Sequence, residues 1–230
     1  MSLPYFYEEF TSDDLPILSE ASAHHAMHVL RMRIGEEIML VNGKGLKMQS
    51  RIVAVSKKSI ALEKIHQQQI EPPTPTLHIA ISFTKNNARI EWFIEKACEM
   101  GIYKITPLLT ARSEKVYYKP DRTEKIIVSA MLQSQQCYKP ILSKPTSLEE
   151  IVQGLEPCKY IAHCEEGIEK GSLHQALLPQ KDTLILIGPE GDFTKDEIHL
   201  CHAKAQEVSL GNNRLRTETA GVYACAVFNA

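Results

Sequence analysis

Residues Leu184–Glu197 read LILIGPEGDFTKDE and hold a strand, a turn and the start of a helix in one run. The first four residues are all apolar, which is typical of a strand buried on both faces of a sheet. Two glycines and a proline then predict a tight turn over Gly188 to Phe193. Thr194 and Glu197 have the spacing of a capping box, which predicts that a helix begins directly after Thr194. This order of elements indicates one repeat of a parallel α/β sheet.

The chain on both sides of this run alternates in the same way. Leu77–Phe83 is a continuous apolar segment, and apolar residues at helical spacing follow it from Ile90 until Gly101 ends the pattern. Strands separated by helices predict a parallel sheet covered on both faces. We expect strands at 77–83, 102–109, 160–164, 184–187 and 208–210, and helices at 90–100, 123–134, 194–205 and 217–228.

The first third of the chain has a different pattern. Apolar residues alternate over Glu36–Ile65, and turn-forming residues such as Asn42 and Gly43 interrupt them, which favours a small β barrel or a sandwich of hairpins. Glu71–Pro75 holds three prolines and predicts a stiff linker. We therefore expect a β domain at 1–70, a linker at 71–76 and an α/β domain at 77–230.

Composition excludes several classes of protein. No apolar run reaches the length of a membrane helix and no signal peptide is evident, so we expect a cytoplasmic protein. The six cysteines are scattered without the paired spacing of a zinc site, so we expect reduced thiols and no metal. The net charge of −2 argues against a nonspecific nucleic-acid binder.

Basic residues are nevertheless concentrated in one segment. From His24 to His66 the chain has eight lysines and arginines against three acidic residues. This excess is compatible with an ordinary solvated surface or with a patch that faces a polyanion. The eight residues are Arg31, Arg33, Lys44, Lys47, Arg51, Lys57, Lys58 and Lys64.

Two loops are candidates for a ligand site, because ligands of parallel sheets bind beyond the carboxyl ends of the strands. One loop is Gly188–Phe193, and the other is Leu210–Ala220, which concentrates arginine, threonine and glutamate before a helix. Taken singly, the first loop could be a plain turn, and Arg216 with Glu218 could be an exposed ion pair. Neither the glycine-rich dinucleotide motif nor the phosphate-binding loop of nucleotide hydrolases occurs in the chain.

These residues in combination resemble the RsmE family of methyltransferases, which belongs to the knotted SPOUT enzymes. The C-terminal signature is Ile187–Gly191 followed by Leu210-Gly211 and Leu215–Ala220. The resemblance extends over nearly the whole chain, and its other matching residues are His25, Val29–Arg31, Lys85, Glu91, Lys96, Glu99, Gly101, Pro107, Arg112 and Ser113. Two departures stand out, since Asp192 replaces a glycine that is common in the family and Gln136 replaces an arginine.

The resemblance implies a fold and an activity. It implies a PUA-like β-barrel domain that binds RNA and a SPOUT domain with a trefoil knot, a parallel sheet and helices on both faces. The implied reaction is S-adenosylmethionine-dependent methylation of N3 of a uridine in 16S ribosomal RNA, within the 30S subunit, by a homodimer. Small residues of the last helix, Ala220, Gly221, Ala224 and Cys225, could pack against a second subunit or against the chain's own sheet.

The resemblance and the chemistry of the implied reaction together suggest roles for individual residues. We expect Arg216 and Glu218 to be catalytic, with Arg216 stabilising charge on the uracil carbonyls and Glu218 accepting a proton or orienting Arg216. We expect Arg31, Lys85, Arg89 and Arg112 to contact RNA. The expected cofactor-binding residues are Ile187, Gly188, Pro189, Glu190, Gly191, Leu210, Gly211, Leu215, Arg216, Thr217 and Thr219.

Two other functions fit the same sequence. A knotted methyltransferase could act on transfer RNA or on a ribose hydroxyl, and a noncatalytic RNA-binding assembly factor could retain the fold. Binding of S-adenosylmethionine would separate the last alternative from the other two. The modified nucleoside would separate the first two.

Overall fold

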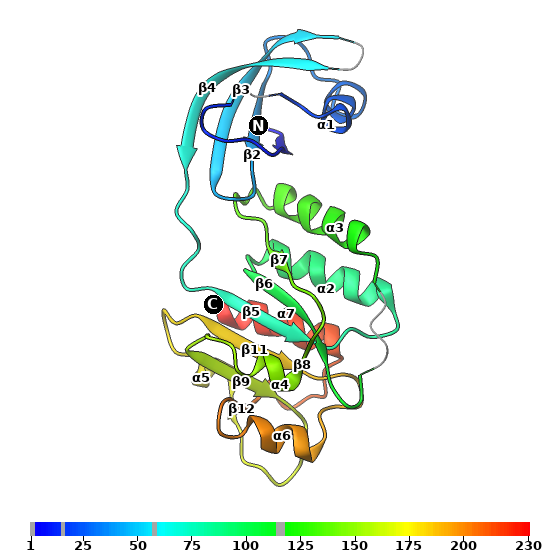
Figure 1. Ribbon diagram of the computed structural model, residues 1–230, viewed down its shortest axis with the longest axis vertical. Coiled ribbons are helices and arrows are strands. Elements are labelled where there is room, and N and C mark those ends of the chain that lie inside the picture. Colours follow the sequence, from blue (N-terminus) through cyan, green and yellow to red (C-terminus); the bar gives the residue numbers. More distant parts are fainter. Residues whose placement is uncertain (1–2, 15–16, 57–58, 114–117) are drawn as a thin grey trace. The chain divides into compact units, whose positions relative to one another are not determined.

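The computed structural model describes residues 3–14, 17–56, 59–113 and 118–230, which form two compact units (Figure 1). The first unit contains residues 1–72 and 131–139, and the second contains 73–130 and 140–230. Each unit therefore consists of two separate stretches of the chain, whereas each range expected from the sequence is one continuous stretch. No helix in the described part of the chain is both long and apolar enough to span a membrane.

The first unit is built on a four-stranded sheet. Its order is β1-β2-β3-β4, in which β1 and β2 are parallel and the other neighbours antiparallel. Apolar side chains from alternate positions of β2 and β3 pack with two short helical segments. The elements are β1 (Tyr5–Tyr7), α1 (Glu20–His24), the π-helical segment η1 (His25–Val29), β2 (Glu37–Val41), β3 (Leu46–Val55) and β4 (Ile60–Gln69).

Residues 131–139 belong to the first unit because they complete a small apolar cluster there. Met131 and Cys137 are buried together with Val41 of β2. The Tyr138 hydroxyl donates a hydrogen bond to the carbonyl oxygen of Ile70, at 2.8 Å. These contacts join segments far apart in the sequence, and no local pattern predicts them.

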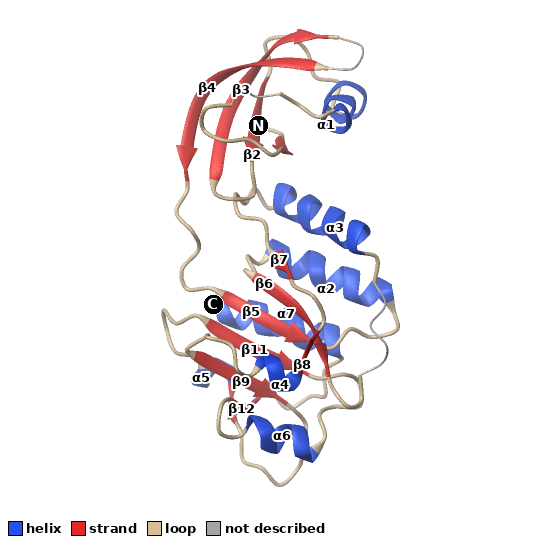
Figure 2. Ribbon diagram, viewed as in Figure 1, coloured by secondary structure: helices blue, strands red, loops and turns tan. Residues whose placement is uncertain are grey.

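The second unit is a parallel sheet with the strand order β10-β12-β9-β11-β5-β6-β7, and β8 pairs with β6 beside this path (Figure 2). This confirms the α/β class expected from the sequence. The strands are β5 (Leu77–Ile81), β6 (Lys104–Leu109), β7 (Ile141–Leu142), β8 (Thr146–Ser147), β9 (Cys158–Ala162), β10 (Gly171–Ser172), β11 (Thr183–Ile187) and β12 (Gln206–Ser209). The helices are α2 (Asn87–Glu99), α3 (Pro120–Gln133), α4 (Leu148–Ile151), α5 (Leu173–Ala176), α6 (Lys195–Cys201) and α7 (Thr217–Phe228).

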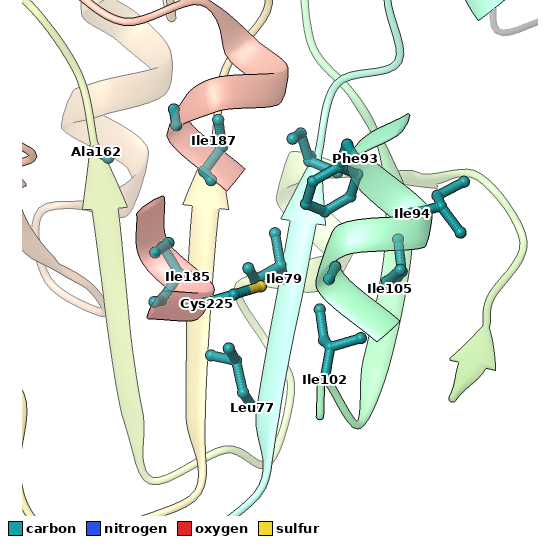
Figure 3. Packing of buried hydrophobic residues seen from close by; sticks show 14 of the residues in the cluster. Leu77, Ile79, Phe93, Ile94, Ile102, Ile105, Ala162, Ile185, Ile187 and Cys225 are labelled. Atoms are coloured by element: carbon teal, nitrogen blue, oxygen red, sulfur yellow. The ribbon is translucent and has the colours of Figure 1, made fainter. Parts of the chain in front are cut away.

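Strand β11 is apolar from Leu184 to Ile187 because each of its faces meets a helical layer. Ile185 and Ile187 of β11 pack in the same cluster as Phe93 of α2 and Cys225 of α7 (Figure 3). The intervening Leu184 and Leu186 belong to a second cluster, with residues of α4 and α6. The sheet is therefore buried on both sides, as the sequence predicts.

The small residues of α7 pack against the chain's own sheet. Ala220, Gly221, Ala224 and Cys225 are all buried within the second unit. A β-carbon added at Gly221 would clash with the ring of Phe93 and approach Cδ1 of Ile81 to 3.0 Å. These small residues could have packed against a second subunit or against the chain's own sheet. In the structure they pack in the chain's own core.

The buried side chain of His78 leads to a prediction of how the stability of the protein depends on pH. His78 Nδ1 lies 2.6 Å from Oε1 of Glu156, and Nε2 lies 2.8 Å from the Thr106 hydroxyl. Burial lowers the pKa of His78 more than the bond to Glu156 raises it. Burial acts to raise the pKa of Glu156, but the hydrogen bonds with His78 and its own backbone amide lower it. Both groups therefore take up protons more readily in the unfolded chain than in the folded protein.

We expect thermal stability to fall as the pH drops from about 6.5, the ordinary pKa of histidine, through the lower pKa of folded His78. The Glu156 contribution falls in the same direction at lower pH, starting from about 4.5. His78→Gln should flatten the dependence of Tm on pH between neutral and mildly acidic conditions. Melting curves over this range measure it, and an unchanged slope in the variant would contradict the assignment.

Candidate functional site

A cavity of about 640 Å³ lies in the second unit, beyond the carboxyl ends of three neighbouring strands. Ile187 of β11 pairs with Ala162 of β9, and Val208 of β12 pairs with the same alanine, so the three strands end together. The loops after them must therefore meet. The lining comes from those loops and from the first turn of α7: Ala162, His163, Cys164, Glu166, Lys170, Ile187, Gly188, Pro189, Glu190, Asp192, Ser209, Leu210, Gly211, Asn212, Asn213, Arg214, Leu215, Arg216, Thr217 and Ala220.

The loop after β11 is held by short-range packing and by α7. Gly188 is buried, and an added β-carbon would lie 3.0 Å from the ring of Phe193. The Thr217 hydroxyl donates a hydrogen bond to the Gly188 carbonyl oxygen at 3.2 Å, which ties the loop to the first turn of α7. The capping box expected at Thr194 and Glu197 is present at the start of α6.

Asp192 shows why a glycine is common at this position. Its φ is +62°, a left-handed conformation in which most side chains are strained. Aspartate tolerates this region better than most residues, and its carboxylate forms two bonds that glycine lacks. Oδ2 accepts from the Cys164 amide at 2.7 Å, and Oδ1 accepts from the Phe193 amide at 2.8 Å. Asp192 therefore links the loops that follow β9 and β11.

The loop after β9 was not among the candidates from sequence. Lys170 donates to the carbonyl oxygens of His163 and Glu165, at 3.0 and 2.7 Å, and so closes the loop. His163 accepts from the Glu165 amide through Nδ1, so Nε2 carries the proton and donates to Glu207 at 2.9 Å. A run of charged residues directly after an apolar strand was the available signal.

The third loop, Leu210–Arg216, supplies the remaining wall. Gly211 has a φ of +124°, and among the described residues other than its two chain neighbours none has an atom within 4 Å of where its β-carbon would be. Arg214 donates to the Glu190 carbonyl oxygen at 3.4 Å, which joins this loop to the one after β11. Arg216 is the N-cap residue of α7, and it is exposed and lines the cavity.

The two residues expected to be catalytic lie in different surroundings. Arg216 faces the cavity, whereas Glu218 is 5% exposed and is not part of the lining. Among the described residues, Arg89 of α2 approaches Glu218, with its Nε 3.6 Å from Oε1. Arg89 Nη1 also lies 4.0 Å from Oε1 of Glu190.

The cofactor-binding residues expected from the resemblance are largely brought together. Of the eleven, Gly191 and Thr219 are outside the lining and the other nine are in it.

The residues expected to contact RNA are dispersed. Arg31 is exposed in the first unit, with a φ of 56°, and Lys85 is exposed in the second. Arg112 donates to the carbonyl oxygens of Gly191 and Phe193 at 2.7 and 3.3 Å, so it supports the cofactor-side loop. Lys57 and Lys58 lie outside the described residues. The described residues contain no group of histidine, cysteine and acidic side chains able to hold a metal ion.

The link formed by Asp192 leads to a prediction. Asp192→Gly removes the strain at positive φ and both carboxylate bonds, so the backbone should tolerate it while the cavity loses its pre-organised wall. We expect ligand affinity to fall about 3- to 10-fold, because a partly exposed hydrogen bond contributes about 1 kcal/mol. Asp192→Asn keeps one acceptor oxygen, so its affinity for the ligand should fall less. Isothermal calorimetry with S-adenosylmethionine measures both, and equal affinity in the glycine variant and the wild type would contradict this role.

Comparison with known proteins identifies the family. The model of the RNA methyltransferase domain matches residues 71–229, and that of the RNA methyltransferase PUA domain matches 18–65. The ribosomal RNA small subunit methyltransferase E of Rickettsia conorii is 28% identical, over 92% of this chain and 88% of that protein.

Solved structures agree in fold over almost the whole chain. A probable rRNA-methyltransferase from Porphyromonas gingivalis has a TM-score of 0.89 and 33% identity, and covers 97% of this chain and 96% of that one. Ribosomal RNA small subunit methyltransferase E from Neisseria gonorrhoeae, bound to S-adenosyl methionine, has a TM-score of 0.81 and 26% identity, over 98% and 96% of the two chains. The chain thus belongs to the RsmE family of S-adenosylmethionine-dependent RNA methyltransferases.

Proposed function

We propose that the protein methylates N3 of one uridine in 16S ribosomal RNA, in the cytoplasm, with the 30S subunit as its substrate. The observation that carries the proposal is the cavity at the ends of β9, β11 and β12, where Arg216 stands beside the loops of the family signature. The Rickettsia relative is named as a methyltransferase of small-subunit ribosomal RNA, which supports the choice of RNA.

The cavity fits S-adenosylmethionine in size and chemistry. Its volume of about 640 Å³ lies within the range of about 300–1,000 Å³ that is usual for small-molecule sites. The open space at Gly211 lets a ligand approach the backbone closely. Acidic Asp192 and basic Lys170 and Arg216 suit a molecule that carries both positive and negative groups.

We propose that the backbone of the loops after β11 and β12 holds the cofactor, through the residues expected from the family signature. Gly191 and Thr219 contribute by shaping their loops, because neither lines the cavity. When bound, S-adenosylmethionine supplies an electrophilic methyl group on a sulfonium centre.

Arg216 is the proposed electrostatic catalyst. The N3 of uracil lies in the middle of its pairing edge, so the base must be unpaired or flipped out before it enters the cavity. As N3 loses its proton, negative charge develops on the two flanking carbonyl oxygens. An arginine held at the cavity wall by its place at the N-cap of α7 stabilises this charge.

The first unit is the proposed RNA-binding part. The family model of a PUA domain covers most of its sheet. Arg31 and Arg33 are exposed beside the apolar side chains of Val29 and Ile34, and the chain has no acidic residue from Ala21 to Gly35. We propose that Arg31 contacts an RNA phosphate, with Lys85 contributing from the second unit. Arg112 retains further donors for RNA beside its two loop contacts.

A homodimer is also proposed, from the family resemblance. Since Gly221 and its small neighbours are buried in the chain's own core, the surface of α7 left for a partner is its exposed face, which includes Thr219, Tyr223 and Ala226. We expect light scattering to give twice the mass of the chain. Tyr223→Glu should shift that mass toward the monomer, and a monomeric wild type with full activity would refute the dimer.

Nucleoside analysis tests the proposed function. Small-subunit RNA from cells that lack the protein should contain no 3-methyluridine at the target position, and the purified protein should restore it on 30S subunits. A missing methyl group on transfer RNA or on a ribose would support the second alternative. Normal nucleosides together with no calorimetric binding of S-adenosylmethionine would support the assembly factor.

A further inference from the structure

We propose that Glu190 accepts the N3 proton and that Arg89, anchored by buried Glu218, is the residue that positions Glu190. This inference rests on the proposed function and changes the roles of three residues. From the sequence, Glu218 was expected either to accept the proton or to orient Arg216, Arg89 to contact RNA, and Glu190 to bind the cofactor. The distances and burial of these residues favour a different division.

Glu218 is poorly placed to meet a substrate. It is 5% exposed, lies outside the lining of the cavity, and its Oε2 is buried with no hydrogen-bond partner in the described part of the chain. A buried carboxylate without donors is costly unless a cation is near. Arg89 approaches its other oxygen to 3.6 Å, so the structure gives Glu218 the role of an anchor for Arg89.

Glu190 has the access that Glu218 lacks. It lines the cavity, and its side chain is 53% exposed. Its backbone carbonyl accepts from Arg214, while its carboxylate lies 4.0 Å from the Arg89 guanidinium, so both ends of the residue face arginines. The side chain is thereby restrained within a loop that has no regular structure.

Arg89 joins these two carboxylates from a third element. It belongs to the first turn of α2, whereas Glu218 belongs to α7 and Glu190 to the loop after β11. Because α2 and α7 share the buried cluster around Phe93, the anchor is rigid. The guanidinium can therefore hold the carboxylate of Glu190 at the cavity.

In the proposed step, two bonds break and two bonds form. The N3–H bond breaks and its proton passes to a carboxylate oxygen of Glu190. The electron pair of that bond forms the new bond between N3 and the methyl carbon. The bond between this carbon and sulfur breaks, and its electron pair stays on sulfur as a neutral thioether. Glu190 then returns its proton to solvent.

The first test is Glu190→Gln in single-turnover methyl transfer to saturating 30S subunits. We expect the rate to fall about 10²- to 10⁴-fold, the usual contribution of a proton acceptor. The affinity for S-adenosylmethionine, measured by calorimetry, should change less than about threefold. A rate within threefold of wild type would overturn the proposal. An inactive wild type would instead refute the proposed function itself.

The second test asks whether Arg89 acts through Glu190. Arg89→Gln should lower the rate by about 10- to 100-fold, and Arg89→Lys should recover part of it because the charge remains. In the Glu190→Gln background, Arg89→Gln should have almost no further effect, since the two residues act as one unit. If the two substitutions multiplied their effects on the rate, Arg89 would act independently of Glu190, and this result would overturn the positioning role.

RNA binding at several salt concentrations provides the decisive contrast for Arg89. A phosphate contact would lower the salt slope by about one when lost, whereas a positioning residue would leave it unchanged. Arg122→Gln is the matched control, because it removes an exposed arginine that pairs with Glu91 and lies outside the cavity lining. If Arg89→Gln unfolds the protein, the double variant with Glu218→Gln removes the buried charge as well and should show the same loss of rate.

Discussion

Arg216→Ala is expected to lower the rate of methyl transfer to bound RNA by about 10²- to 10³-fold, the cost of losing one donor that stabilises charge in a transition state. The side chain lines the cavity at the N-cap of α7, and no side-chain bond caps this helix, so the helix should tolerate alanine. The loss should appear in the rate more than in binding, because the stabilised charge develops only during the reaction. Single-turnover transfer to saturating 30S subunits measures it.

Arg31→Ala provides the comparison for this experiment. Arg31 is exposed in the first unit, and its loss should weaken RNA binding and lower the salt slope by about one, with no change in the affinity for S-adenosylmethionine. Filter binding at several salt concentrations measures this effect. If Arg31→Ala bound RNA normally and Arg216→Ala lost affinity alone, the roles of the two arginines would be reversed.

Gly221→Val is expected to lower the free energy of unfolding of the second unit. Overpacking of a core costs about 1–3 kcal/mol, and we expect a loss toward the upper end of this range. A β-carbon at this position already clashes with Phe93, and valine adds two methyl groups in the same crowded space. Phe93 is fully buried between α2 and the sheet, so it has little room to move. Urea denaturation followed by circular dichroism measures the change.

Gly171→Ala is the matched control for this substitution. Gly171 lies in β10, and its φ is not in the positive range. Apart from its two chain neighbours, no residue that the structure describes has an atom within 4 Å of its added β-carbon. The free energy of unfolding of the Gly171→Ala variant should therefore stay close to that of the wild type. Equal stability of both variants and the wild type would show that α7 can move away from the sheet.

Local patterns predicted the larger elements because each depends on a signal carried by neighbouring residues. The apolar run of β11 and the capping box of α6 are read from consecutive residues, and both are present. Short elements such as β7 and β10 were not predicted, because a strand of two residues has no periodicity. The same reason explains α4 and α5, which have four residues each.

The candidate site was predictable in its loops and much less so in its geometry. Gly188–Glu190 and Leu215–Thr217 stand out by composition, and the structure brings them to one cavity. His163 and Lys170 carry no comparable motif, and they line the cavity only because β9 ends beside β11. The pairing of parallel strands that are distant in sequence decides such neighbours.

The sequence alone determined the alternation of buried strands and helices, the position of the glycine-containing turns and the resemblance to one family of RNA methyltransferases, because these depend on the order of residues along the chain. Tertiary structure alone decided that Glu218 is buried, that Arg89 lies between Glu218 and Glu190, and that residues 131–139 join the first unit. Burial and charge pairing depend on which distant segments pack together, and that packing minimises exposed apolar surface and unpaired charge over the whole fold.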